Sequence, residues 1–317
     1  MEALMRKNIS VEFEVSIVMP TKNCLDYLAR AIASIEAQQL QNVQLIVVND
    51  GSTDGTDDWL RAYHGPLALC QINADVSSPA LARNLGLAEA SAPLVAFLDD
   101  DDIWRPGKLV AQIEAHWKDP ALVMSFTDYR HVGIHGDDRG TCYEYWRMRA
   151  PANGAFARLP SPASTLLGRN IVGTSTVMAR RDALWAAGGF DPDLPSSEDW
   201  DLWLTLAKAG PVAWSGLVGA DYLMRPGSRT SARRHRYEAL KMIADRHLPR
   251  VKCHWRDRLR LAARLQIGQA EALAQEARPW AAAAHHVWGG ILAGEPRAFR
   301  DSLANVLTSR TPAARSA

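Results

Sequence analysis

The chain has 317 residues, of which 47% are hydrophobic and 22% charged, a composition typical of a globular protein with a substantial core. The absence of a run of about 18 apolar residues argues against a membrane-spanning helix. The first residues lack the apolar core of a signal peptide. Four cysteines stand far apart without metal-ligand spacing, so we expect reduced thiols in a cytoplasmic protein.

The formal net charge of +1 hides two opposed parts. Residues 1–224 carry 18 Lys and Arg against 28 Asp and Glu, whereas residues 225–317 carry 18 against 7. The sequence therefore predicts an acidic body and a basic tail. Such a tail suits peripheral contact with an anionic membrane, and the alternative is a solvated basic face that packs on the acidic body. It lacks a nucleic-acid recognition motif, so we expect no nucleic-acid partner.

Short apolar runs alternate with helical periods in the first hundred residues. We expect strands at 15–20, 43–48, 68–72 and 93–98, and helices at 27–39, 56–63 and 80–90. Each strand is a nearly continuous apolar run, which is typical of a strand buried on both faces. The predicted fold class is therefore α/β, with a mostly parallel central sheet and helices on both faces.

Polar residues gather just after the carboxyl ends of these strands, at 20–23, 49–51 and 99–102. In open α/β sheets, ligands bind at this edge. The four consecutive aspartates at 99–102 repel one another, and a divalent cation would relieve that repulsion. Oxygen ligands favour Mg²⁺ or Mn²⁺. A solvated acidic turn is the alternative interpretation of the run taken alone.

The second half of the chain is less regular at first. Residues 133–164 predict loops and short strands that form the variable part of a substrate site. Order returns with a strand at 173–181, a helix near 182–187, and a helix at 197–207 that Ser197 opens. From about residue 231 helical spacing prevails, which predicts a C-terminal α-helical extension, with one helix–turn–helix repeat at 261–296.

Five segments together resemble the inverting glycosyltransferases of family 2, which have the GT-A fold. They are VSIVMPTKN at 15–23, VVNDGSTD at 47–54, ARNLG at 82–86, LDDDDIW at 98–104, and GGFD at 188–191 followed by Glu198 and Asp199. The resemblance covers about two thirds of the chain, from residue 14 to residue 231. Five segments in the family's order and approximate spacing are a far more specific signal than any one alone.

The resemblance implies a nucleotide-sugar site and a metal site at the strand ends. Asp101 is expected to contact the metal, with Asp99 as its partner ligand or as a ribose contact, and Asp50 to accept a hydrogen bond from the base or ribose. Arg83 is expected to pair with the base or diphosphate. The residues expected to bind the nucleotide sugar are Pro20, Thr21, Asn23, Asp50, Arg83, Asp99, Asp100 and Arg225.

The resemblance also implies a catalytic base. A sugar hydroxyl must lose its proton to attack, and Asp199 stands at the family's base position, with Glu198 as the second choice. Trp200 and Thr174 are expected to contact the acceptor. Many family members carry a His where this chain has Arg225; an Arg is unable to ligate a metal but neutralises phosphate directly.

These expectations combine into one hypothesis. The chain is expected to be a metal-dependent, inverting glycosyltransferase that moves a sugar from a nucleoside-diphosphate donor, UDP first, to a hydroxyl acceptor in surface polysaccharide or glycolipid assembly. Mn²⁺ or Mg²⁺ is the expected cofactor, and the acceptor is a glycan or a lipid-linked glycan. The alternatives are a catalytically silent sugar-nucleotide-binding scaffold and a nucleotidyltransferase.

The resemblance also divides the chain. Residues 1–230 are expected to form the GT-A domain, with a nucleotide-sugar half at about 14–130 and an acceptor half at about 131–230. Residues 231–317 form the helical extension. The expected location is the cytoplasm, with peripheral contact to the inner face of the membrane through the basic helices.

Overall fold

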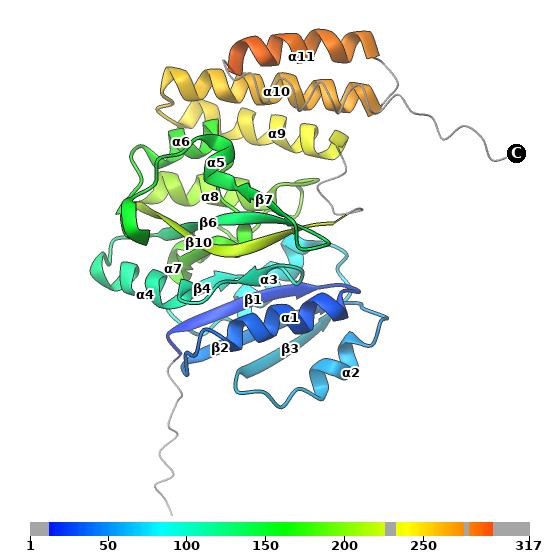
Figure 1. The fold of residues 1–317 in the computed structure, drawn as a ribbon, viewed down its shortest axis with the longest axis vertical. Helices are drawn as coiled ribbons and strands as arrows, with labels where there is room; N and C mark the ends of the chain where they lie inside the picture. The colour runs from blue at the N-terminus through cyan, green and yellow to red at the C-terminus, as the bar shows by residue number, and fades with distance from the viewer. Residues whose placement is uncertain (1–12, 226–232, 276–278, 294–317) are drawn as a thin grey trace, which may run out of the picture.

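A computed structural model describes residues 13–225, 233–275 and 279–293 (Figure 1). A central sheet carries helices on both faces, and α9 (Arg233–His247), α10 (Trp255–Gln275) and α11 (Pro279–Ala293) stack at one end of the molecule. The predicted α/β class and the helical C-terminal extension are therefore confirmed.

The sheet order is β3-β2-β1-β4-β9-β6-β10-β5. The strands are β1 (Val15–Thr21), β2 (Val43–Asp50), β3 (Ala68–Ala74), β4 (Leu94–Phe97), β5 (Ile103–Trp104), β6 (Met124–Gly133), β7 (Asp138–Thr141), β8 (Phe156–Arg158), β9 (Val177–Arg180) and β10 (Val212–Met224). β1 pairs in parallel with β2 on one side and with β4 on the other, and β2 pairs in parallel with β3. β9 runs antiparallel between β4 and β6, and β6 and β10 are parallel again.

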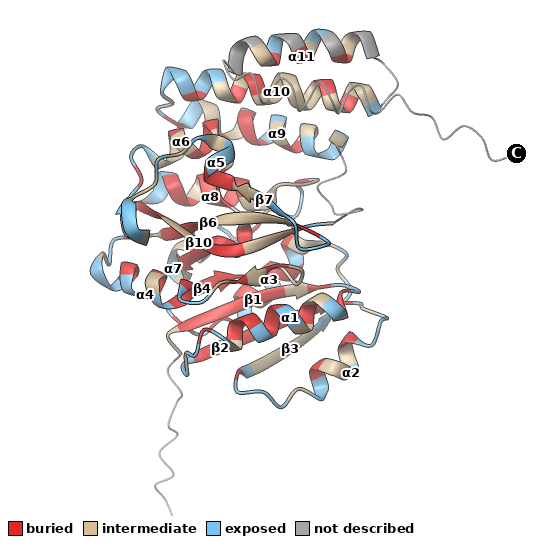
Figure 2. Cartoon of the chain, viewed as in Figure 1, coloured by how far each residue is buried: buried red, intermediate tan, exposed pale blue. Residues whose placement is uncertain are grey.

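The remaining helices connect these strands. They are α1 (Leu25–Glu36), α2 (Thr56–Arg61), α3 (Pro79–Glu89), α4 (Lys108–Lys118), α5 (Cys142–Trp146), α6 (Pro162–Gly168), α7 (Arg181–Ala186) and α8 (Glu198–Ala209), with 3-10 turns η1 (Ala152–Gly154), η2 (Thr174–Thr176) and η4 (Leu248–Arg250). Side chains of α1 and α4 belong to one hydrophobic cluster, and those of α3 and α8 belong to the other. The buried strands of the sheet lie between these two cores (Figure 2).

Two glycine-containing segments of the sequence are explained by close packing. A Cβ on Gly86 would lie 2.5 Å from Cγ1 of Val18, so only glycine lets α3 approach β1 this closely. Gly189 adopts a positive φ of 72°, and Asn84 beside it donates to the carbonyl of Phe190 and accepts from its amide. The ARNLG and GGFD segments are thus bonded to each other, and Phe190 packs edge-on against Phe97.

The helical extension packs onto α8. His247 is fully buried and lies 2.8 Å from Asp201, which also pairs with Arg246. Ile243 and Leu261 belong to the same hydrophobic cluster as α3 and α8. The extension is therefore continuous with the core beneath it, and its predicted boundary near residue 231 lies outside the described residues.

Several elements differ from the expectations. The strand expected at 173–181 begins only at Val177, because Thr174–Thr176 form the 3-10 turn η2. The expected loops and short strands of 133–164 also contain the helix α5, which Thr141 opens with a capping box, and the start of α6. Helix α4 and the long strands β6 and β10 were not anticipated.

Candidate active site

The residues expected at the ligand-binding edge lie together in the structure. Thr21 ends β1, Asp50 ends β2, and the aspartates follow β4. The base candidates open α8, and Arg225 follows β10. The carboxyl ends of strands far apart in the sequence therefore form one acidic edge.

Arg83 joins the two acidic segments of this edge. Its Nη2 lies 2.6 Å from Oδ1 of Asp99, and its Nη1 lies 2.9 Å from Oε1 of Glu198. Burial opposes the charge of the guanidinium, but the two carboxylates raise its pKa. The guanidinium also lies over the ring of Phe190, 5.5 Å from the centroid. Arg83 is thus held on two sides, and it fixes the start of α8 against the end of β4.

Asp100 and Asp101 carry charge that the protein offsets only in part. Burial, followed by repulsion from Asp101 and Asp99, raises the pKa of Asp100 to about 7. Burial and Asp99 also raise the pKa of Asp101, although its Oδ2 lies 2.7 Å from Nε of Arg225. The ring of Tyr27 lies beneath that guanidinium, 5.6 Å away. Arg225, predicted to contact phosphate, here pairs with the candidate metal ligand.

The fourth aspartate, Asp102, is buried and held by hydrogen bonds within the protein. Asp102 is 1% exposed and accepts hydrogen bonds from the Ser175 hydroxyl at 2.6 Å and from the amide of Leu223 at 3.1 Å. The Ser175 hydroxyl in turn accepts from the amide of Asp99. Burial raises the pKa of Asp102 well above its usual value. Asp102 therefore joins the end of β4 to η2 and β10, and Ser175 is a residue that the sequence analysis missed.

Asp199 lies on α8 beside the Arg83 bridge. Its Oδ2 accepts a hydrogen bond of 2.8 Å from the Thr174 hydroxyl. Burial and the neighbouring Glu198 raise the pKa of Asp199 to about 6, while Arg83 and Thr174 oppose that rise. A carboxylate with a pKa near 6 is a stronger base than an ordinary aspartate and is still ionised at neutral pH. Thr174, expected at the acceptor, orients this carboxylate.

Asp50 and Asn23 hold the loops of the nucleotide half. Oδ1 of Asp50 accepts from the amides of Val76 and Ser77, at 2.7 and 2.9 Å. Its Oδ2 lies 3.7 Å from Nζ of Lys22, a residue that the prediction did not include. Asn23 adopts a φ of +52° and its side-chain oxygen accepts from the amide of Thr53. Both expected ligand residues therefore also tie neighbouring loops together, and Pro20 and Thr21 lie beside them at the end of β1.

The expectation for Trp200 is wrong. The indole is 1% exposed, its Nε1 donates to the carbonyl of Leu166, and the guanidinium of Arg264 lies 4.4 Å from the ring centroid. Helix α10, which carries Arg264, covers the face that the prediction left open to an acceptor. Trp200 is a core residue beneath the site.

The donor set fits a hard divalent cation. The acidic edge carries Asp99, Asp100 and Asp101. Burial and then the two neighbouring carboxylates raise the pKa of Asp100, and a cation would relieve the repulsion among the three. Among residues 13–225, 233–275 and 279–293, no three His, Cys, Asp or Glu side chains are grouped so as to hold a metal by themselves. A metal held by Asp101 and Asp99 would therefore take its other ligands from the donor diphosphate and water.

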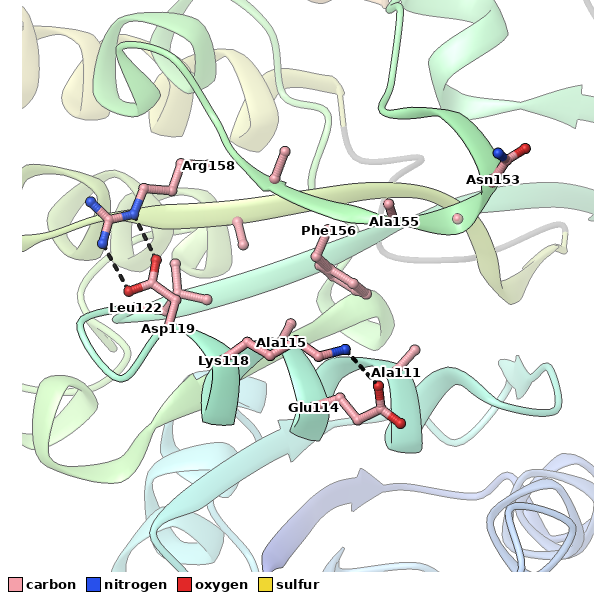
Figure 3. Close-up of a pocket in the computed structure, with 13 residues that line it drawn as sticks. Ala111, Glu114, Ala115, Lys118, Asp119, Leu122, Asn153, Ala155, Phe156 and Arg158 are labelled. Carbon is pink, nitrogen blue, oxygen red and sulfur yellow. Dashed lines mark hydrogen bonds and ion pairs between the residues drawn. The ribbon is translucent and has the colours of Figure 1, made fainter.

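A separate hollow of about 340 Å³ lies between α4 and residues 153–158 (Figure 3). Its charged side chains are already paired, Lys118 with Glu114 and Arg158 with Asp119. It contains none of the residues of the acidic edge.

In the described part of the chain, no helix has the length and apolar character needed to cross a membrane.

Comparison with known proteins gives a consistent result. The model of the family "Glycosyl transferase family 2" matches residues 16–174. A putative teichuronic acid biosynthesis glycosyltransferase of Bacillus subtilis, TuaG, is 31% identical over 203 residues, which are 63% of this chain and 74% of that protein. The WfaP protein of Escherichia coli, a UDP-Glc:alpha-D-GlcNAc-diphosphoundecaprenol beta-1,3-glucosyltransferase, is 33% identical over 218 residues, or 68% of this chain and 78% of WfaP.

Some relatives are much longer. The chain spans only 28% of an uncharacterized glycosyltransferase of Rickettsia bellii, to which it is 26% identical over 204 residues, or 64% of its own length.

Two solved structures share the fold. S. aureus TarS, residues 1–349 with UDP-GlcNAc, has a TM-score of 0.65 at 17% identity, over 94% of this chain and 89% of that one. The mannosyltransferase PcManGT of Pyrobaculum calidifontis, with GDP-Man and Mn²⁺, has a TM-score of 0.64 at 20% identity, over 94% and 86%.

The family match covers Asp50 at the end of β2, Arg83 on α3, and the aspartates that follow β4. The two solved structures cover 94% of this chain, so the likeness in fold extends beyond residue 174. On this evidence, the chain belongs to glycosyl transferase family 2.

Proposed function

We propose that the chain is an inverting, metal-dependent glycosyltransferase. It transfers a sugar from a nucleoside-diphosphate donor, UDP first, to a hydroxyl of a glycan or lipid-linked glycan in surface polysaccharide or glycolipid assembly. Residues 1–230 are the catalytic part, with a nucleotide-sugar half at about 14–130 and an acceptor half at about 131–230, and residues 231–317 are the C-terminal helical extension. The observation that carries the proposal is the Arg83 bridge, which holds Asp99 and Glu198 at one edge of the sheet.

The two sides of this bridge suit the two ends of a single displacement. The aspartates after β4 lie on the donor side, where a bound Mg²⁺ or Mn²⁺ would offset the charge on the departing diphosphate. Arg225 lies at the same place and can neutralise phosphate once it leaves Asp101. On the other side, Asp199 accepts the proton of the attacking hydroxyl, with its carboxylate oriented by Thr174.

The relatives support the choice of substrates. WfaP is named for a UDP-glucose donor and a diphosphoundecaprenol-linked acceptor, and TuaG for teichuronic acid assembly. TarS was solved with UDP-GlcNAc, and PcManGT with GDP-Man and Mn²⁺. A UDP-sugar donor and a lipid-linked acceptor are therefore the first substrates to test, with GDP as the competing nucleotide.

Thermal unfolding with UDP or GDP, each with and without Mn²⁺, tests the donor side, because a ligand that binds the native state raises the midpoint. We expect UDP with Mn²⁺ to give the largest rise, and Asp101→Ala to lose the metal-dependent part. Asp138→Ala, which removes an exposed carboxylate from β7, is the matched control. An unchanged rise in Asp101→Ala would refute the metal assignment.

Turnover separates the proposed enzyme from the scaffold alternative. The full chain is incubated with a panel of UDP- and GDP-sugars, with Mn²⁺ and lipid-linked or soluble glycans, and release of the nucleoside diphosphate is measured. We expect release from at least one donor. A protein that binds UDP with Mn²⁺ but turns over no donor in the panel would be the scaffold.

A further inference from the structure

The corner between α9 and α10 presents basic and apolar side chains to solvent. Its exposed members, which we call the basic corner, are Arg250, Lys252, Trp255, Arg256, Arg258 and Leu259. Trp255 is 59% exposed and Leu259 is 39% exposed, one helical turn apart on α10. Figure 2 shows this end of α10 as exposed. None of these side chains belongs to the candidate active site.

The charges of the basic corner are not neutralised by neighbouring carboxylates. The one acidic residue of the segment, Asp257, is buried and is held by Arg260 and the Ser164 hydroxyl. Within the described part of the chain, no carboxylate forms an ion pair with Arg250, Lys252, Arg256 or Arg258. The positive potential reaches Lys208, whose pKa is lowered by burial and then by Arg250. An anionic partner could therefore bind these four cations without first breaking an ion pair.

Trp255 distinguishes the basic corner from an ordinary charged surface. Its ring lies outside the core, with the guanidinium of Arg256 5.2 Å from the centroid. An indole with nearby Arg and Lys side chains is the combination found at membrane interfaces, where the ring enters the headgroup region and the cations meet lipid phosphates. A nucleic acid would bind the positive charges, but it would not account for the exposed Leu259, which lies one turn beyond Trp255 on α10.

We propose that the basic corner docks the protein on an anionic phospholipid surface. Four cations supply the electrostatic attraction, and Trp255 and Leu259 insert among the headgroups. This inference rests on the proposed function, because a lipid-linked acceptor lies in a membrane. It goes further by naming the surface that makes the contact, separate from the acidic edge that binds the donor.

Sedimentation of the full chain with vesicles tests the proposal. The vesicles contain phosphatidylcholine alone, or phosphatidylcholine with phosphatidylglycerol. We expect binding to the anionic vesicles only, weakened by salt. The fourfold variant R250Q/K252Q/R256Q/R258Q should bind roughly 100-fold or more weakly, and Trp255→Ser roughly 10-fold more weakly. A thermal midpoint close to that of the parent shows that each variant is folded.

Matched controls remove the same groups elsewhere on the surface. R61Q/K118Q/R139Q/R158Q deletes four exposed positive charges, and Trp117→Ser deletes an indole that is 63% exposed. Both should retain the binding of the parent. An equal loss in the control, no binding to phosphatidylglycerol vesicles, or equal affinity for duplex DNA would each overturn the proposal.

The result is separable from the proposed reaction. Donor turnover with a soluble acceptor should be unchanged in the fourfold variant, because the basic corner lies outside the acidic edge. Turnover without vesicle binding would overturn the docking surface alone. Vesicle binding without any turnover would leave the docking surface standing and refute the proposed function.

Discussion

Two clusters of carboxylates meet at Arg83, and their surroundings differ. The aspartates after β4 crowd one another at a strand end, where burial and mutual repulsion raise the pKa of Asp100 to about 7. Glu198 and Asp199 instead open α8, and Asp199 has one neighbouring acid, a hydroxyl donor and a pKa of about 6. Under the proposed function, the first cluster receives a cation and the second accepts a proton. Four predictions test this difference, from the largest effect to the smallest.

Asp199→Asn removes the proposed base but keeps the shape of the side chain. We expect transfer to fall roughly 10²- to 10⁴-fold, because the acceptor hydroxyl keeps its proton. UDP affinity with Mn²⁺, measured by calorimetry, should stay within about twofold, since the donor side is intact. The control is Asp193→Asn, an exposed aspartate in the turn before α8. Retained transfer would move the base to Glu198.

Arg225→Gln should change metal and nucleotide affinity in opposite directions. Without Arg225, Asp101 no longer has its 2.7 Å ion pair, so Mn²⁺ alone should bind more tightly. UDP with Mn²⁺ should bind roughly tenfold more weakly, because a charge-assisted contact to the diphosphate is lost. Calorimetry with Mn²⁺ first and UDP second measures both. If both affinities fall together, Arg225 does not exchange partners between Asp101 and phosphate.

Asp100→Asn should make the metal-free protein more stable than the parent, and this gain should grow as the pH rises. The folded-state pKa of about 7 exceeds the usual value, so ionising Asp100 opposes folding. This decrease in the free energy of unfolding begins above pH 4 and is complete above about pH 7. There, removal of the charge should raise the free energy of unfolding by about 1 kcal/mol, because Asp100 is only half-buried. Urea unfolding with a chelator at pH 5 and pH 8 measures it. A gain that is equal at both pH values would contradict this prediction.

Thr174→Val tests the pKa of the proposed base. The Thr174 hydroxyl donates to the ionised form of Asp199 and lowers its pKa, so its loss should raise that pKa. The acid limb of kcat/KM, expected near pH 6, should move to higher pH by less than about one unit. Thr205→Val, which removes a hydroxyl elsewhere on α8, should leave the limb in place. A lower maximum rate with no movement of the limb would mean that Thr174 acts through packing alone.

The sequence predicts which residues lie at the edge of the sheet better than it predicts which partner each of them has. The strand-end residues could be predicted because parallel strands bring their carboxyl ends to one edge whatever the loops between them do. Asp99, predicted at a strand end, and Arg83, predicted on a helix that faces the same edge, lie 2.6 Å apart. What the sequence left open was the partner of each group, such as Ser175 for Asp102.

Trp200 shows why the remainder was not predictable. Its apolar neighbours on α8 predict burial of one helix face, but an aromatic side chain at the start of α8 suits either a core or a sugar platform. The answer depends on α10, more than 50 residues later, whose Arg264 covers the ring. Strand β10 was not predicted because Gly216 and Gly219 weaken its strand pattern. Gly219 is required by the structure, since a Cβ there would collide with Thr127.

The contact of Asp201 with Arg246 and His247 has a consequence for anyone who shortens this protein. A fragment cut before α9 would leave the carboxylate of Asp201 without either partner, two positions from Asp199. The same cut would uncover the Trp200 indole by removing Arg264. We therefore expect the smallest working enzyme to be longer than the segment that carries the family's motifs, because α9 and α10 hold the start of α8 in place.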